Sequence, residues 1–126
     1  MVARAISHFR ARQTGLWYLP ASRRDTVFPR KEPDLDLAEI HNLYCLGCFQ
    51  QESWRRFFQE LALSPHCVSY EELAENYGSS VRGVLRFLGV HSEETVITPP
   101  RSAIQSDALS KEWEECYRKL RADGGI

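Results

Sequence analysis

Three side chains that bind metals or act as nucleophiles lie on one face of a predicted helix. His41, Cys45 and Cys48 are spaced i, i+4 and i+7, which brings them together on a helical surface. They could hold a metal ion with Cys67 or His66 as a fourth ligand, but zinc sites usually place paired cysteines in a tight turn. Redox cysteine pairs normally begin a helix instead. We therefore expect buried or reduced thiols here, and no metal ion.

A second candidate is Tyr70, at a predicted junction between a strand and a helix. The apolar run 66–69 follows Pro65 and is typical of a brief buried strand. Ser69 stands three residues before Glu72, the spacing of a capping box at a helix start. Ligands of open α/β sheets bind beyond the carboxyl ends of strands, where helix N-termini attract anions. Tyr70 would offer a ligand its ring and hydroxyl there, or it would simply pack beside the strand.

The beginning of the chain combines basic charge with two aromatic side chains. Residues 1–33 carry seven Lys and Arg against two acidic residues, although the net charge of the whole chain is −1. A basic end can bind phosphate or sulfate groups, or it can merely solvate a surface. Trp17 and Tyr18 follow Gly15. Their rings could stack on a sugar or a base, or they could fill the core.

No familiar catalytic motif is complete. Gly78 and Gly83 have P-loop spacing, but Val84 and Leu85 stand where that loop needs Lys and Ser or Thr. The Gly-x-Ser-x-Gly turn of hydrolases is absent. The residues alone therefore do not assemble a catalytic site.

The elements that would position these residues are mostly helices. Apolar spacing and capping residues predict helices over 2–16, from Asp36 to about Leu61, from Ser69, through 81–88 with Gly89 ending it, and from Ser106 or Asp107 to Asp123. The last helix should bury one side and carry two i, i+4 ion pairs on the other: Leu109, Trp113, Cys116 and Leu120, with Glu114–Arg118 and Glu115–Lys119 outside.

Length and composition fit one small domain. The chain has 126 residues, of which 43% are hydrophobic and 26% charged. It has no apolar run of about 18 residues that would span a membrane, and its start is too polar for a secretory signal. Four cysteines without a signal indicate reduced thiols and a cytoplasmic location.

The single predicted strand leaves the fold open. Unpaired buried backbone groups cost roughly 1–3 kcal/mol each, so a lone buried strand needs neighbours. The chain is then the later part of a larger α/β domain, a chain whose strand pairs with a partner, or an all-helical protein in which 66–69 is merely extended.

Three segments of the chain, in order, resemble bacterial sulfotransferases of the trehalose 2-sulfotransferase-like family. The first is Ala-Arg-Ala-Ile-Ser followed by Arg-Ala-Arg-Gln-Thr-Gly-Leu-Trp, within 3–17. The second is Val-Ser-Tyr-Glu-Glu-Leu through Phe-Leu-Gly-Val, within 68–90, and its pattern recurs across sulfotransferases. The third is Gln-Ser-Asp-Ala-Leu-Ser-x-Glu-Trp, within 105–113. The first and third segments are the more specific.

The resemblance implies a P-loop-like α/β fold, of which 1–126 would be one partial, C-terminal domain. It implies sulfuryl transfer from 3′-phosphoadenosine 5′-phosphosulfate (PAPS) to a carbohydrate hydroxyl such as that of trehalose, and a homodimer. Ser7 matches the serine that binds the 3′-phosphate of the donor, and Tyr70 a position near the adenine. A basic residue often precedes the third segment, where this chain has Ile104; Arg101 is the candidate to replace it. Trp17 is the candidate platform for the sugar.

The chain also departs from the family. It lacks the strand and loop that cradle the phosphosulfate, and the acidic residue expected to accept the hydroxyl proton. We therefore expect a truncated, inactive portion of a sulfotransferase. The alternative is a non-catalytic helical interaction module derived from that family.

Overall fold

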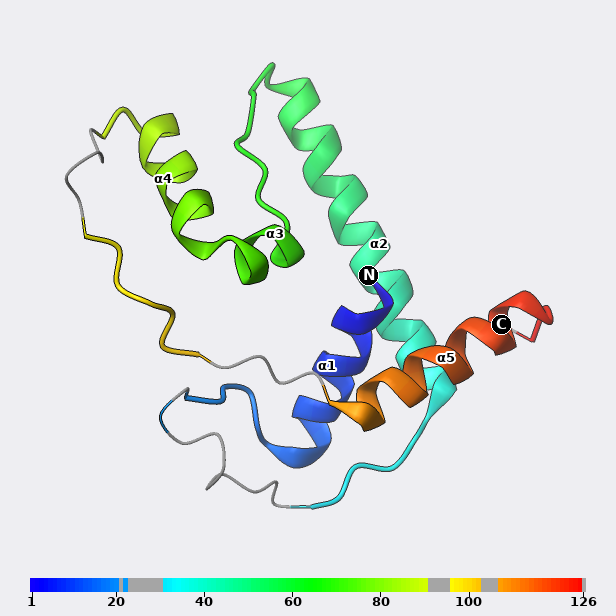
Figure 1. The fold of residues 1–126 in the computed structure, drawn as a ribbon. Helices are drawn as coiled ribbons and strands as arrows, with labels where there is room; N and C mark the ends of the chain where they lie inside the picture. Colours follow the sequence, from blue (N-terminus) through cyan, green and yellow to red (C-terminus); the bar gives the residue numbers. More distant parts are fainter. Residues whose placement is uncertain (21, 23–30, 91–95, 103–106, 126) are drawn as a thin grey trace.

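The computed structural model describes residues 1–20, 22, 31–90, 96–102 and 107–125. This part of the chain forms five α-helices: α1 (Val2–Thr14), α2 (Leu37–Glu60), α3 (Tyr70–Glu75), α4 (Tyr77–Phe87) and α5 (Ala108–Ala122) (Figure 1). The same residues form no strand, apart from one isolated antiparallel bridge between Pro20 and Ser102. The expectation of a mostly helical chain is confirmed.

Capping residues begin α2, α3 and α5 where the sequence predicts, whereas α4 begins at Tyr77, before the predicted start at Val81, without a side-chain cap. The Asp36 carboxylate accepts a hydrogen bond from the backbone N–H of Glu39 at 3.0 Å, and the Ser69 hydroxyl accepts one from Glu72 at 3.1 Å. These bonds satisfy N–H groups that have no partner inside the helix. Gly15 ends α1 in the left-handed conformation, with φ 72°.

Three helices share a small buried core. Figure 1 shows α1 lying across the first half of α2, with α5 against both. The buried side chains come from all three helices: Ala5, Ile6, Phe9, Ile40, Trp113 and Tyr117. We call α1, the first half of α2 (37–48) and α5 the three-helix core.

The rest of the described chain is much less covered. Trp54, Phe57 and Phe58 on the second half of α2 contact one another, with ring centroids 5.6–5.7 Å apart. Trp54 is nevertheless 59% exposed, and Leu61, two turns further on, is also exposed. We call residues 49–90, which comprise the second half of α2 with α3 and α4, the arm. Its largest apolar side chains face solvent.

The predicted strand at 66–69 is wrong. These residues are exposed and have no regular structure. His66 instead stacks on Phe87 of α4, with ring centroids 5.2 Å apart. A strand requires a neighbour for its backbone groups, and the described residues supply none. Among the described residues, 66–69 is therefore an extended segment and not a strand.

The predicted buried side of α5 is wrong by one position. Tyr117 is fully buried, whereas Cys116 is exposed. Trp113 is buried as expected, and the Glu114–Arg118 ion pair forms at 2.6 Å. The partner helices α1 and α2 select the face that α5 buries, and they favour the larger aromatic side chain.

Candidate functional site

Ser7 lies on the outer side of α1. Its neighbours Ala5, Ile6 and Phe9 are buried against α2 and α5, which turns the intervening position toward solvent. The Ser7 side chain is exposed. The packing of α1 therefore leaves this hydroxyl open to solvent.

Trp17 returns to α1 beside His8. Gly15 reverses the chain direction after α1, and the Trp17 ring then lies 5.6 Å from the ring of His8, at an angle of 59°. The indole is 63% exposed. Trp17 is thus an accessible aromatic surface next to the residue that follows Ser7, and it is not part of the core.

Arg101 is joined to the same region through its backbone. The Tyr18 hydroxyl donates a hydrogen bond to the Arg101 carbonyl at 2.9 Å, and the Pro20–Ser102 bridge lies beside it. The Arg101 side chain is exposed. These contacts thus link neighbours of the candidate residues: His8 follows Ser7 and contacts Trp17, and Tyr18 follows Trp17 and contacts the Arg101 backbone. Ile104, whose place Arg101 was expected to take, lies outside the described residues.

Tyr70 lies in the other region. It is the first residue of α3, in the arm, and it is 64% exposed. No contact among the described residues joins it to Ser7, Trp17 or Arg101. Since residues 66–69 form no strand, Tyr70 does not lie at a junction between a strand and a helix, where a ligand was expected. The family resemblance remains its only support.

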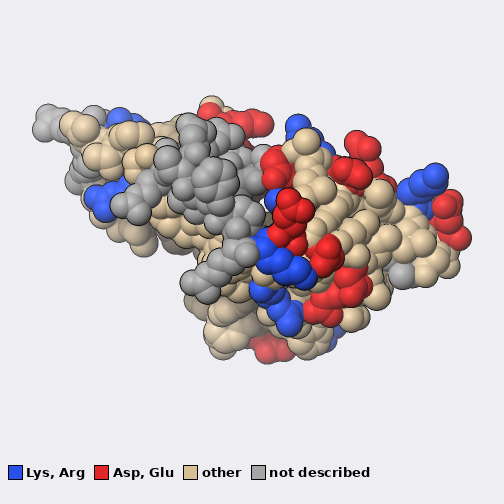
Figure 2. Space-filling view, turned by 90° about the horizontal axis from the view of Figure 1, so that it is seen from below, with Lys and Arg blue, Asp and Glu red and all other residues tan. Residues whose placement is uncertain are grey.

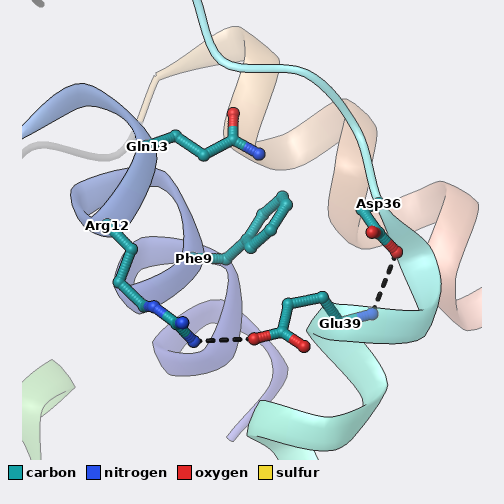
Figure 3. A pocket seen from close by; sticks show the side chains of 5 residues that line it. All are labelled: Phe9, Arg12, Gln13, Asp36 and Glu39. Atoms are coloured by element: carbon teal, nitrogen blue, oxygen red, sulfur yellow. Dashed lines mark hydrogen bonds and ion pairs between the residues drawn. The ribbon is translucent and has the colours of Figure 1, made fainter.

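A cavity of about 460 Å³ opens between α1 and the start of α2. Figure 3 shows the Phe9 ring between the side chains of Gln13 and Glu39, with Arg12 and Asp36 completing the wall. Arg12 pairs with Glu39 at 2.6 Å, and Asp36 caps α2. The cavity can admit a small polar group. Because its charged side chains are already engaged, it offers no ready acid–base pair, and it contains none of the predicted site residues.

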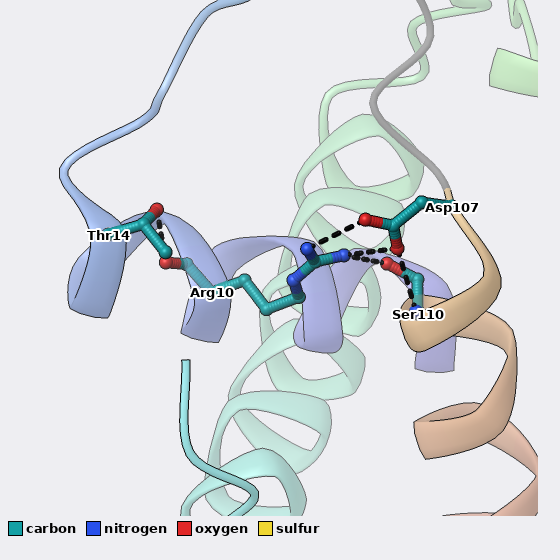
Figure 4. A network of polar contacts seen from close by, with 4 residues as sticks. All are labelled: Arg10, Thr14, Asp107 and Ser110. Carbon is teal, nitrogen blue, oxygen red and sulfur yellow. Dashed lines mark hydrogen bonds and ion pairs between the residues drawn. The ribbon is translucent and has the colours of Figure 1, made fainter. Parts of the chain in front are cut away.

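Arg10 connects two of the segments that carry the family resemblance. It reaches from α1 to the start of α5, where its two terminal nitrogens donate to the two carboxylate oxygens of Asp107 at 2.6 and 2.9 Å (Figure 4). The Arg10 guanidinium also donates to the Ser110 hydroxyl. The hydrogen bond from Arg10 lowers the pKa of Asp107 to about 2. This bidentate pair holds α5 against α1.

No local pattern in the sequence indicates the Arg10–Asp107 pair. Arg10 and Asp107 are 97 residues apart, and each was assigned only a local role, in a basic segment and in a helix cap. Both residues lie within the specific family segments, which indicate importance but not a shared contact.

Arg10 and Arg12 are both in ion pairs, so the basic N-terminal segment is partly neutralised. Figure 2 shows acidic and basic side chains interspersed on one face.

The suspected metal-binding face has another arrangement. His41 contacts Tyr117 and Cys45. Within the described ranges, no group of three His, Cys, Asp or Glu side chains is placed to hold a metal ion. Those ranges also contain no helix that is both long and apolar enough to cross a membrane.

Comparisons with known proteins agree with the resemblance. The family model described as Stf0 sulphotransferase matches residues 1–120. The chain is 33% identical over all its 126 residues to a trehalose 2-sulfotransferase of Mycolicibacterium smegmatis, and it spans 45% of the length of that protein. No solved structure matches the chain. Since the family model covers nearly all of it, the chain belongs to the Stf0 sulphotransferase family.

Proposed function

We propose that this chain forms the nucleotide-binding, C-terminal part of a sulfotransferase that uses PAPS. Family membership supports sulfuryl transfer, and the relative in Mycolicibacterium smegmatis is described as a trehalose 2-sulfotransferase. A carbohydrate hydroxyl is accordingly the proposed acceptor. The observation that carries the proposal is the exposed Ser7 on α1, together with the contacts that bring Trp17 to the neighbouring His8 and the Arg101 backbone to Tyr18.

The available side chains fit the nucleotide end of the donor. Ser7 offers a hydroxyl and Arg101 a guanidinium, both exposed and both suited to a phosphate group. Trp17 offers an aromatic face for a sugar ring. When bound, PAPS supplies the activated sulfuryl group. We propose that Ser7 and Arg101 hold its 3′-phosphate and that Trp17 orients the acceptor.

A P-loop-like α/β fold is part of the same proposal. The described residues supply only helices. The parallel sheet of such a fold would therefore be formed by residues other than these, as in the part of the longer relative that this chain does not cover. Sulfuryl transfer also needs cations around the transferred group and a base for the acceptor hydroxyl. Because the described part of the chain brings no such set together, we expect no turnover by these 126 residues alone.

Nucleotide binding tests the proposal directly. Calorimetric titration of the chain with 3′-phosphoadenosine 5′-phosphate should give saturable binding. Ser7→Ala should weaken that binding by about 1–2 kcal/mol, the scale of a hydrogen bond to a charged group. Ser79→Ala is the matched control, because Ser79 is also exposed but lies on α4 in the arm. Absence of binding by the folded chain, or equal effects of both variants, would refute the assignment of Ser7.

The non-catalytic interaction module remains a second candidate, supported by the exposed aromatic side chains of the arm. The family resemblance implies a homodimer, and we propose that two copies cover this surface by pairing through Trp54, Phe57 and Leu61. A folded chain that dimerises without binding the nucleotide would favour the interaction module. Nucleotide binding would favour the sulfotransferase part.

A further inference from the structure

Cys45, His41 and Tyr117 form a connected series of polar contacts outside the proposed nucleotide site. His41 Nε2 lies 3.4 Å from Cys45 Sγ, and His41 Nδ1 lies 2.9 Å from the Tyr117 hydroxyl oxygen. Both distances are those of hydrogen bonds, since bonds to sulfur are longer than bonds to oxygen. A nucleophile therefore contacts an imidazole, and the imidazole contacts a group that can orient it. This arrangement activates cysteine in many proteins.

The two helices fix this arrangement from both sides. His41 and Cys45 are one turn apart on α2, whereas Tyr117 comes from α5. Tyr117 is fully buried in the three-helix core. Tyr44 stacks against His41, with ring centroids 6.3 Å apart and an angle of 22°. Tyr44 and Tyr117 also contact each other, with ring centroids 5.7 Å apart, so the imidazole is one member of a cluster of three rings. The Cys45 thiol remains exposed.

The direction of the hydrogen bond between Tyr117 and His41 depends on the imidazole tautomer. Burial raises the pKa of Tyr117, so its side chain is a neutral phenol, which can donate to Nδ1 or accept from Nδ1–H. In the tautomer with the proton on Nδ1, Nε2 is unprotonated and can accept the thiol proton of Cys45, and this is the tautomer in which His41 acts as a base. Arg121 donates to the Tyr44 hydroxyl at 3.0 Å, which places a positive charge beside the ring that stacks against His41.

We propose that Cys45 is a redox-reactive thiol, oxidised by small hydroperoxides to a sulfenic acid with His41 as its base. The thiol proton passes to Nε2, and the thiolate sulfur attacks a hydrogen-bearing oxygen of the peroxide. The O–O bond breaks as the S–O bond forms, and the imidazolium gives its proton to the leaving hydroxide or alkoxide. The products are cysteine sulfenic acid and water, or an alcohol from an organic hydroperoxide, so sulfur is oxidised and the peroxide reduced.

The chain contains its own controls. Cys67 and Cys116 are exposed like Cys45, but neither has an imidazole within hydrogen-bonding distance among the described residues. Cys48 is half-buried and lies on the same helix. Exposure alone would make Cys45, Cys67 and Cys116 equally reactive. Activation by His41 would single out Cys45.

The test treats the intact chain with a limiting amount of hydrogen peroxide in the presence of dimedone, which traps sulfenic acids. Peptide mass spectrometry then gives the labelling rate of each cysteine, with fragment spectra separating Cys45 from Cys48. Cys45 should label about tenfold faster than Cys67 and Cys116, below the ~100-fold typical of a base in an enzyme site. Equal rates at the three exposed cysteines would overturn the proposal.

Two variants identify the activating groups. His41→Gln should reduce the Cys45 rate to that of Cys116 and leave the rates of Cys67 and Cys116 unchanged. His66→Gln is the matched control, because His66 contacts Phe87 in the arm. Tyr117→Phe, which keeps the ring in the core, should lower the Cys45 rate by a smaller factor. If Cys45 labels at the wild-type rate in both His41→Gln and Tyr117→Phe, the proposed relay is wrong.

Discussion

The helix α2 passes through two regions that differ in how they are covered. Its first half buries Ile40 between α1 and α5, while its second half carries Trp54 and Phe57 into solvent. The apolar spacing is similar in both halves. An amphipathic pattern specifies which face of a helix is apolar, whereas burial of that face depends on which elements lie opposite it. The three-helix core supplies its own neighbours, and the arm does not.

The strongest test of the comparison removes apolar volume from the first half of α2 and from the residue that follows its last turn in the arm. Ile40→Ala should lower the free energy of unfolding by about 2–5 kcal/mol, because it leaves a cavity in the three-helix core. Leu61→Ala deletes a side chain of the same size that is 54% exposed in the arm, and it should cost less than about 1 kcal/mol. Urea unfolding followed by circular dichroism measures both. Similar losses would mean that the arm is buried as well as the core.

A second test compares an ion pair in each region. Arg10→Gln should cost about 1–2 kcal/mol, because the guanidinium is largely buried and makes bidentate hydrogen bonds to Asp107. Arg55→Gln removes an exposed pair with Glu52 in the arm, where the expected loss is within about 0.5 kcal/mol. The same unfolding measurement applies. A larger loss for Arg55→Gln would reverse the ranking of the two regions.

The Asp107 carboxylate should make the stability of the three-helix core sensitive to acid. Its pKa falls from 3.8 to about 2 in the folded chain, mainly through the hydrogen bond from Arg10. The ionised form therefore stabilises the fold above pH 3.8, and this contribution is lost as pH falls toward about 2. Because Asp107 is half exposed, we expect about 1 kcal/mol. Asp107→Asn should remove this part of the pH dependence, which stability measurements across this range would reveal.

The smallest effect on stability is expected from Trp54→Ser in the arm, within about 0.5 kcal/mol. Its effect on association should be larger, since the proposed pairing of two copies uses this ring. Sedimentation velocity should show a shift from dimer to monomer. Trp17→Ser is the control, because Trp17 is equally exposed but lies beside α1. If both variants behave like the wild-type chain, the arm is not the dimer surface.

Local interactions made the helices predictable. The caps at Asp36, Ser69 and Asp107 and the left-handed Gly15 act within a few residues, so the sequence contains all the information that they require. The two errors concern partners. A strand at 66–69 needs a second strand, and the choice of Tyr117 over Cys116 depends on how α5 rests on α1 and α2.

The candidate site shows the same limit. Ser7 and Trp17 were predicted as individual residues, and the structure places them near each other only through the reversal at Gly15 and the contact with His8. The Arg10–Asp107 pair and the contact of His41 with Tyr117 join helices far apart in the sequence. A single sequence cannot show such pairings, because neither partner constrains the local pattern around the other.

Because α2 is one continuous helix, movements of the arm and of the three-helix core are coupled through it. At about 1.5 Å per residue, Glu60 lies some 30 Å along the helix axis from Ile40. A tilt of roughly 5° about Ile40 would displace the far end of this helix by about 2.6 Å. Binding at the aromatic rings of the arm that displaces the end of α2 would therefore rotate its first half slightly against α1 and α5. If α2 stays straight, the displacement at Glu60 and the rotation at Ile40 describe the same motion.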